Sequence, residues 1–217
     1  MKNIVFIAPH GTGKGTQCNY LVEKYNYAHI STGELIRATI KKQDDFAKEL
    51  ETVINSGQLV SDEIVLEMIK NHLQENNIKG NIVFDGYPRT LNQAKSLDEL
   101  MESLNQKIDL AIYLEIPKEE AMKRTFGRLN CPKCGASYNK FYDFLKPKVE
   151  GICDKCGEPL VGRSDDTEEA FNNLFEVFLN DTYPILDYYK TKNVLKTIDA
   201  CQNMEDIFKE IEESLEA

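Results

Sequence analysis

The sequence has no run of apolar residues approaching the roughly 20 needed to cross a bilayer. Its first residues, MKNIVFIA, become glycine-rich and polar too soon for a signal peptide, which needs a longer apolar region and a small-residue cleavage site. It also lacks internal repeats and low-complexity linkers. Apolar residues make up 41% of the chain, enough for a substantial core. We therefore expect a cytoplasmic, globular protein with no membrane partner.

Basic residues are in deficit, and arginine is scarce among them. The chain has 26 basic against 36 acidic residues, a formal net charge of -10. Proteins that bind nucleic acid are usually basic, so we expect no nucleic-acid partner. Arginine provides a planar bidentate donor, so scarce arginines can mark anion sites, although chance placement is the alternative. The arginines are Arg37, Arg89, Arg124, Arg128 and Arg163.

Short apolar strands alternate with helical patterns along the chain. Strands are expected at 2–8, 28–30, 81–86, 109–116 and 194–198, with helices at 14–25, 34–55, 61–76, from 117 onward, at 165–189 and at the acidic C-terminus. This alternation predicts a doubly wound α/β fold. Two stretches, 31–60 and 127–164, interrupt it where they could fold over a ligand crevice at the carboxyl ends of the strands.

The stretch A-P-H-G-T-G-K-G-T (8–16) is close to a phosphate-binding loop between a strand and a helix. Its glycines would let backbone N–H groups approach phosphate, Lys14 would reach the terminal phosphates, and Thr16 would contact Mg²⁺ or its water. The residues assigned to phosphate binding here are Gly11, Thr12, Gly13, Lys14, Gly15 and Thr16. A plain glycine-rich turn is the alternative, because Ala8 and Gly15 depart from the general pattern.

Four of the six cysteines form two C-x-x-C pairs separated by 18 residues. This spacing predicts a four-thiolate zinc site that leaves no open coordination position, so the metal would be structural. Disulfides are the alternative, which an intracellular chain disfavours. The predicted ligands are Cys131, Cys134, Cys153 and Cys156. Cys18 and Cys201 lie in stretches that we interpret as helical, and we expect them to be inert.

A third motif, F-D-G-Y-P-R-T (84–90), follows a buried strand. Asp85 at the strand end is placed to hold a water molecule of Mg²⁺, and Arg89 would lie on the crevice floor. Together with G-x-G-K-G-T-Q, I-S-T-G-E, the paired C-x-x-C and R-S-D-D, this motif makes the whole chain resemble adenylate kinases with a zinc-bearing lid.

The resemblance implies transfer of the γ-phosphoryl group of ATP to AMP with Mg²⁺, giving two ADP, by a protein that is usually a monomer. It also implies an α/β P-loop core with a five-stranded parallel sheet at 1–30, 61–126 and 165–217. A helical insertion that binds the nucleoside monophosphate would occupy 31–60, and the zinc-binding lid would occupy 127–164. Catalysis would consist of positioning and charge neutralisation, which fits three histidines with no nucleophile beside them.

Site residues follow from the same resemblance. AMP would be held by Thr32, Arg37, Leu59, Val60, Gly86, Arg89 and Gln93. Arg124 would pack on the donor adenine, and Arg128 would bind the ATP phosphates. The catalytic set would be Lys14, Arg89, Arg128 and Arg163, with Asp165 and Asp166 ordering the lid arginines.

Three positions depart from the family pattern. Ala8 replaces a glycine and His10 replaces a proline. Leu174 stands where the family has a phosphate-binding arginine, eleven residues after Arg163. We expect a slow kinase with weakened AMP binding, and a His10 that faces solvent, the alternative being a His10 that contacts phosphate. Other possible functions are GTP:AMP phosphotransfer, a nucleotide-binding regulator with little turnover, and a zinc-ribbon interaction module.

Overall fold

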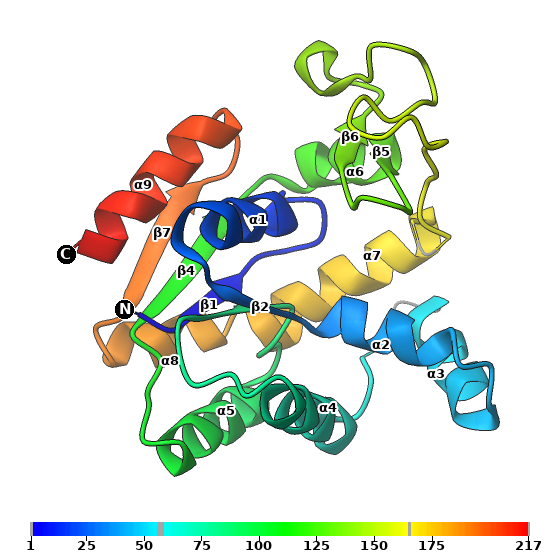
Figure 1. The fold of residues 1–217 in the computed structure, drawn as a ribbon. Helices are drawn as coiled ribbons and strands as arrows, with labels where there is room; N and C mark the ends of the chain where they lie inside the picture. Colours follow the sequence, from blue (N-terminus) through cyan, green and yellow to red (C-terminus); the bar gives the residue numbers. More distant parts are fainter. Residues whose placement is uncertain (1, 56–58, 165, 217) are drawn as a thin grey trace.

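The computed structural model describes residues 2–55, 59–164 and 166–216. Its centre is a five-stranded parallel sheet in the order β2-β3-β1-β4-β7 (Figure 1). The sheet confirms the predicted α/β class. The strands are β1 (Ile4–Ile7), β2 (Ala28–Ser31), β3 (Ile82–Asp85), β4 (Leu110–Glu115) and β7 (Leu195–Asp199).

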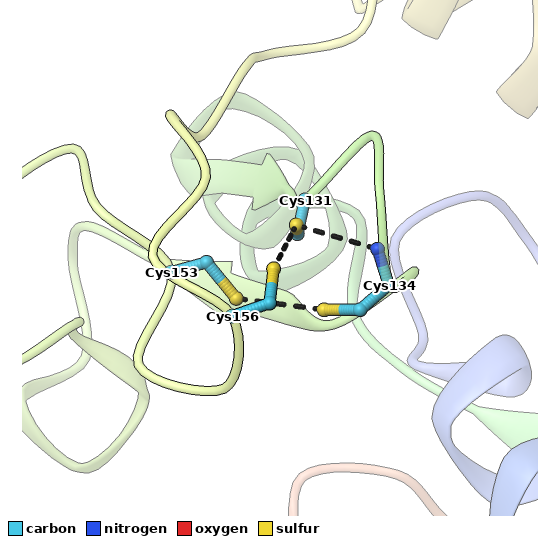
Figure 2. Close-up of side chains that lie close together, drawn as sticks. All are labelled: Cys131, Cys134, Cys153 and Cys156. Carbon is cyan, nitrogen blue, oxygen red and sulfur yellow. Dashed lines mark hydrogen bonds between the residues drawn. The ribbon is translucent and has the colours of Figure 1, made fainter.

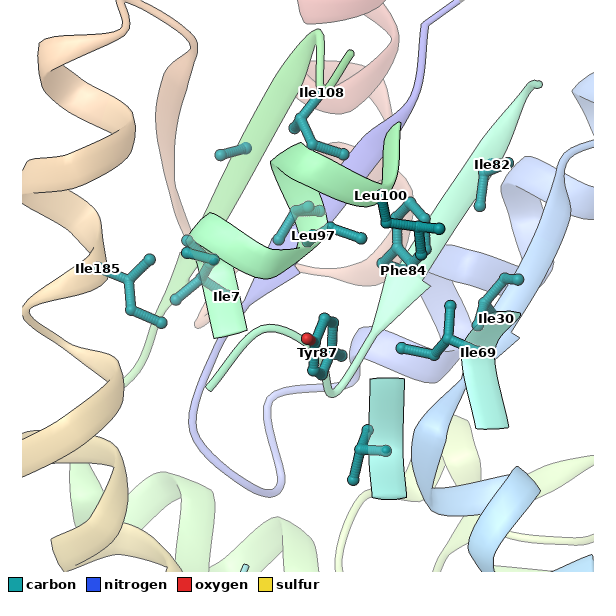
Figure 3. Close-up of a cluster of buried hydrophobic side chains, with 14 of the residues drawn as sticks. Ile7, Ile30, Ile69, Ile82, Phe84, Tyr87, Leu97, Leu100, Ile108 and Ile185 are labelled. Atoms are coloured by element: carbon teal, nitrogen blue, oxygen red, sulfur yellow. The ribbon is translucent and has the colours of Figure 1, made fainter. Parts of the chain in front are cut away.

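Helices cover both faces of this sheet. Successive β1 residues point to opposite faces, so Val5 and Ile7 join one apolar cluster while Ile4 and Phe6 join the other. The first cluster takes side chains from α4 (Asp62–Glu75), α5 (Leu91–Ser103) and α8 (Ile185–Thr191), as Figure 3 shows. The second takes them from α1 (Lys14–Tyr25), α6 (Lys118–Gly127), α7 (Glu168–Val177) and α9 (Met204–Glu216).

Several helices begin at side-chain caps that can be recognised in the sequence. The Ser31 hydroxyl accepts from Glu34 N–H at the start of α2 (Thr32–Ile40), and the Ser61 hydroxyl accepts from Ile64 N–H at the start of α4. A break after Ile40 precedes α3 (Asp45–Asn55), as expected near Gln43–Asp45. Between residues 32 and 55 this segment thus consists mainly of two helices, and its status as a separate domain stays a prediction.

The long helix expected at 165–189 is interrupted. A π-helical turn, η2 (Phe178–Thr182), separates α7 from α8, and Tyr183 N–H donates to Phe178 O five residues back. Pro184 follows directly and has no N–H to continue the α-helical ladder. The periodic apolar pattern of the sequence does not indicate this change from α-helical to π-helical hydrogen bonding.

The segment 127–164 contains two short strands and one short 3₁₀ turn. β5 (Arg128–Asn130) pairs antiparallel with β6 (Ser137–Asn139), and η1 (Asp143–Leu145) is a short 3₁₀ turn. Figure 1 shows this segment projecting beyond the end of α6, near the start of α7. None of the helices in the described part of the chain is long and apolar enough to span a membrane.

Candidate active site

The phosphate-type loop joins β1 to α1, as the sequence predicts. The N-cap of α1 is Gly13, in the left-handed region with no side-chain cap, so the helix start presents backbone N–H groups to a ligand. At Gly11, with φ +86°, an added Cβ would lie 2.3 Å from Ala121 O, so only glycine fits there. Ala8 is not in the left-handed region, so its methyl causes no backbone strain.

Lys14 and Asp85 face each other across this loop. Lys14 Nζ lies 3.8 Å from Asp85 Oδ1, and the side chains are only 18% and 16% exposed. Burial raises the pKa of Asp85, but Lys14 and His29 outweigh burial and bring it down to about 2. Burial lowers the pKa of Lys14, and Asp85 opposes that shift. Asp85 therefore stays ionised, as a group associated with Mg²⁺ must be.

A small cavity of about 50 Å³ opens at the head of the loop. Lys14 and Arg89 contribute its cationic wall, and burial lowers the pKa of Arg89. Leu174, Val177 and Phe178 contribute apolar side chains to the lining. Leu174 thus lines the same cavity as Lys14 and Arg89.

Most of the residues predicted to hold AMP lie together beside β3. Thr32 Oγ1 donates to Gly86 O at 3.0 Å, and Arg89 Nε donates to the same carbonyl at 2.9 Å. At Gly86, with φ +82°, an added Cβ would lie 2.8 Å from Thr32 Oγ1. Backbone, hydroxyl and guanidinium are therefore packed at a spacing that no larger residue allows.

Gln93 is held at both ends of its amide. Its Oε1 accepts from Arg89 N–H and its Nε2 donates to Asp62 Oδ1, each at 2.6 Å. Asp62 was missed at the sequence level, where only its place in the first turn of a helix was visible. Leu59 is half-buried and Val60 is packed in the core, and Arg37 lies beside Gly33.

Arg124 is fixed against the back of the loop. Its Nε pairs with Glu120 Oε1 at 2.8 Å, and its Nη1 donates to Ala200 O at 2.8 Å. The Tyr142 ring lies 6.0 Å from its Cζ. Arg163 accepts a backbone hydrogen bond from Asp166 N–H. Asp165, predicted to order the lid arginines, lies outside the described residues.

Arg128, Asp166 and His10 form one hydrogen-bonded group. Arg128 donates to both carboxylate oxygens of Asp166, from Nε at 3.0 Å and from Nη2 at 2.5 Å. Nη2 is also 2.8 Å from His10 Nε2, which lies 3.1 Å from Asp166 Oδ1. Burial lowers the pKa of His10 to about 4, although its contact with Asp166 opposes the shift. The expectation of a solvent-facing His10 is wrong, because the side chain is 22% exposed.

The neutral state of His10 determines what its ring can do. An arginine only donates, so we assign Nε2 as the acceptor from Arg128 and place the ring proton on Nδ1. Nε2 is then unavailable as a donor to phosphate. Nε2 and Asp166 Oδ1 are then two acceptors around the same guanidinium, and they form a hydrogen bond with each other only when Nε2 is protonated. Sequence reasoning missed this contact because the three residues are far apart in the chain.

The four predicted zinc ligands converge in the segment 127–164 (Figure 2). Their sulfur atoms all lie within 4.8 Å of one another, with 3.3 Å between Cys131 and Cys156 and 3.5 Å between Cys134 and Cys153. A tetrahedral ion with Zn–S bonds of about 2.3 Å would separate its sulfurs by about 3.8 Å. None of the four forms a disulfide. Their donor set and spacing fit zinc.

Local hydrogen bonds favour a thiolate at Cys131 and Cys153, whose pKa values are lowered, while hydrogen bonds with neighbouring sulfurs raise the pKa of Cys134 and Cys156. Burial raises the pKa of the Cys153 thiol, but hydrogen bonds from Tyr138 and from the backbone N–H of Cys156 outweigh it and bring the pKa to about 6. Cys134 N–H points at the sulfur of Cys131, 3.5 Å away. A thiol that ionises easily is ready to bind a metal ion.

Comparison with known proteins agrees with this geometry. The family model for adenylate kinase matches residues 6–194. An adenylate kinase of Clostridium tetani is 40% identical over 215 residues, covering 99% of each chain. One from Archaeoglobus fulgidus is 40% identical over 99% of this chain and 98% of its own, and one from Thermodesulfovibrio yellowstonii is 41% identical over 96% of each. The chain belongs to the adenylate kinase family and is an enzyme of that type.

Proposed function

We propose that this enzyme transfers the γ-phosphoryl group of ATP to AMP, giving two ADP, in a Mg²⁺-dependent reaction of reduced efficiency. The observation that carries the proposal is the cavity that Lys14 and Arg89 share with Leu174 at the head of the phosphate loop. Two cations there can neutralise a transferring phosphoryl group. The third charge that the family places at the position of Leu174 is missing.

The proposed reaction needs no general base. An oxygen of the AMP phosphate, already anionic, attacks the γ-phosphorus as the bond to the leaving ADP oxygen breaks. Lys14, Arg89, Arg128 and Arg163 neutralise the charge spread over the phosphoryl oxygens. Bound Mg²⁺ neutralises phosphate oxygens, and Thr16 and ionised Asp85 are the residues that would hold it or its water.

The remaining chain divides by role in this proposal. The core is 1–30, 61–126 and 165–217, the segment 31–60 holds AMP, and 127–164 is a lid that excludes water. Zinc on the four cysteines would join a lid with little apolar core, since in the described residues its two paired strands have three residues each. We propose that the protein acts as a monomer in the cytoplasm.

A coupled assay with Mg²⁺·ATP and AMP, on protein of known zinc content, tests this function. Steady formation of two ADP for each ATP consumed, in the presence of Mg²⁺, supports it. Tight nucleotide binding without turnover would contradict it in favour of a regulatory role. Replacing ATP by GTP in the same assay decides the donor, and faster ADP and GDP formation from GTP would overturn the choice of ATP.

A further inference from the structure

A second group of metal-ligating side chains lies away from the four cysteines. Cys18 on α1, His29 on β2 and Asp85 at the end of β3 bring Sγ, a ring nitrogen and a carboxylate oxygen within 4.8 Å of one another. Cys18 is fully buried, while the side chains of His29 and Asp85 are 15% and 16% exposed. The three residues lie on different elements, so the pairing of β2 with β3 and the packing of α1 against the sheet create the group.

The separation between His29 and Asp85 is that of two ligands around one ion, and the Cys18 sulfur lies within 4.8 Å of both. His29 Nε2 lies 3.5 Å from Asp85 Oδ2, at the outer limit of hydrogen bonding, and it has no closer partner in the described part of the chain. A good hydrogen bond would place the two atoms about 2.7–3.2 Å apart. Two N and O ligands at about 2.1 Å from a tetrahedral ion are separated by about 3.4 Å. The buried Nε2 therefore fits a ligand better than a hydrogen-bonded group.

Lys14 does not occupy the same carboxylate oxygen. Its Nζ approaches Asp85 Oδ1, at 3.8 Å, while Oδ2 faces His29. An ion on Oδ2 would leave the Lys14 contact in place. The thiolate and carboxylate together carry two negative charges, which balance a divalent cation beside the positive charge of Lys14.

We propose that Cys18 Sγ, His29 Nε2 and Asp85 Oδ2 bind one thiophilic divalent cation, of the class of Zn²⁺ or Co²⁺. Sulfur and imidazole ligands select such ions over Mg²⁺, which requires oxygen. Binding breaks the S–H bond of Cys18 and forms a metal–sulfur bond, releasing one proton to solvent. Three protein ligands leave a fourth position for water.

The site shares Asp85 with the Mg²⁺ position of the proposed function. Its expected effect on turnover rests on that proposed function, whereas metal binding does not. An ion held on Oδ2 fixes a carboxylate that the catalytic Mg²⁺ or its water would use. Zinc beyond the equivalent held by the four-cysteine cluster is therefore expected to inhibit ADP formation. Metal binding itself needs no turnover for its detection.

The test is an optical titration of the full chain with Co²⁺, with the four-cysteine cluster already loaded with zinc and without nucleotide. One further equivalent of Co²⁺ should bind and give the near-ultraviolet sulfur-to-cobalt absorption of a thiolate ligand. Zinc content, measured after the titration, should remain at one equivalent. Loss of zinc with the appearance of the band would assign the signal to the lid cysteines and overturn the proposal.

Two variants and one matched control locate the site. Cys18→Ala should abolish the band and weaken Co²⁺ binding by more than about 100-fold, since changes behind the ligands alone cost about 10–100-fold. His29→Gln, at a partly exposed position, should weaken binding while keeping the sulfur band at saturation. Cys201→Ala is the matched control and should change neither the band nor the affinity for Co²⁺. Cys201 is exposed and lies in the turn after β7, whereas the sequence predicted a helix there. No band in the unaltered protein, or an equal band in a folded Cys18→Ala, would overturn the proposal.

Discussion

His10 Nε2 lies 2.8 Å from Arg128 Nη2 and accepts its hydrogen bond, which joins the phosphate loop to the start of β5. The same guanidinium is held by Asp166, so Arg128 has acceptors on two sides. A histidine in the loop thus acts on a second cation and contributes no positive charge itself, because its pKa is about 4.

Stability should depend on pH through His10. The pKa of His10 is about 4 in the folded protein against 6.5 for the free side chain. Between these values the unfolded chain binds a proton that the folded protein does not. The contribution is therefore complete above pH 6.5 and is lost as the pH falls toward 4, by about 3 kcal/mol. Urea unfolding of the protein and of His10→Gln across this range checks this: the free energy of unfolding of the protein should fall relative to that of His10→Gln between pH 6.5 and 4, and the difference between the two should be constant above pH 7. Parallel curves for the two proteins would contradict it.

The neutral state of His10 also predicts how ATP binding depends on pH. Since His10 stays uncharged from pH 6 to 8, the ratio of ATP affinities of the protein and His10→Ala should be constant over that range. Calorimetric titrations at pH 6, 7 and 8 check this. A ratio that grows toward pH 6 would mean that a protonated His10 contacts phosphate.

Leu174→Arg should raise the rate of phosphotransfer. The side chain is half-buried and lines the cavity with Lys14 and Arg89, so an arginine can place its charge there. A charged donor to a transition-state phosphate contributes about 10²–10³ in rate, and we expect kcat/KM for AMP to rise at least about tenfold. Leu179→Arg, on an exposed residue nearby, is the matched control and should leave the rate unchanged. An equal rise in rate in both variants would mean that the added net charge, and not a contact in the cavity, causes the increase.

Removing zinc should destabilise the segment 127–164 before the core. Cys153→Ser is expected to lose bound zinc and to lower the melting temperature by several degrees, about the effect of 1–2 kcal/mol in a domain of this size. Cys201→Ser controls for the loss of a thiol. Metal analysis and calorimetry check both. Full zinc retention in Cys153→Ser would remove this residue from the ligand set.

Gly86→Ala should weaken AMP binding and lower stability. The added Cβ would meet Thr32 Oγ1 at 2.8 Å and Arg89 Nη2 at 3.2 Å, at a φ of +82°. Gly151→Ala imposes a similar φ of +73° in open space, so it isolates backbone strain of about 1 kcal/mol. The excess cost of Gly86→Ala, together with a raised KM for AMP, measures the clash. Equal costs and unchanged KM would show that the neighbours move aside.

The sequence by itself determined the fold class and the position of the glycine-rich loop between a strand and a helix, and it predicted which four cysteines meet. Each depends on local pattern: apolar strands that alternate with helices, glycines beside Lys14, and cysteines two residues apart. Caps such as Ser31 and Ser61 act within four residues, so their effect is also readable along the chain.

Only the tertiary structure decided which distant groups meet. Register in the parallel sheet places Ser31, at the end of β2, beside Asp85, at the end of β3, and so brings His29 to the carboxylate. Burial beside Arg128 makes His10 a neutral acceptor. The π-helical turn before Pro184 likewise depends on backbone hydrogen bonding that apolar periodicity does not encode. The burial and the charges at these contacts come from residues that are far apart in sequence, so local sequence patterns do not predict the contacts.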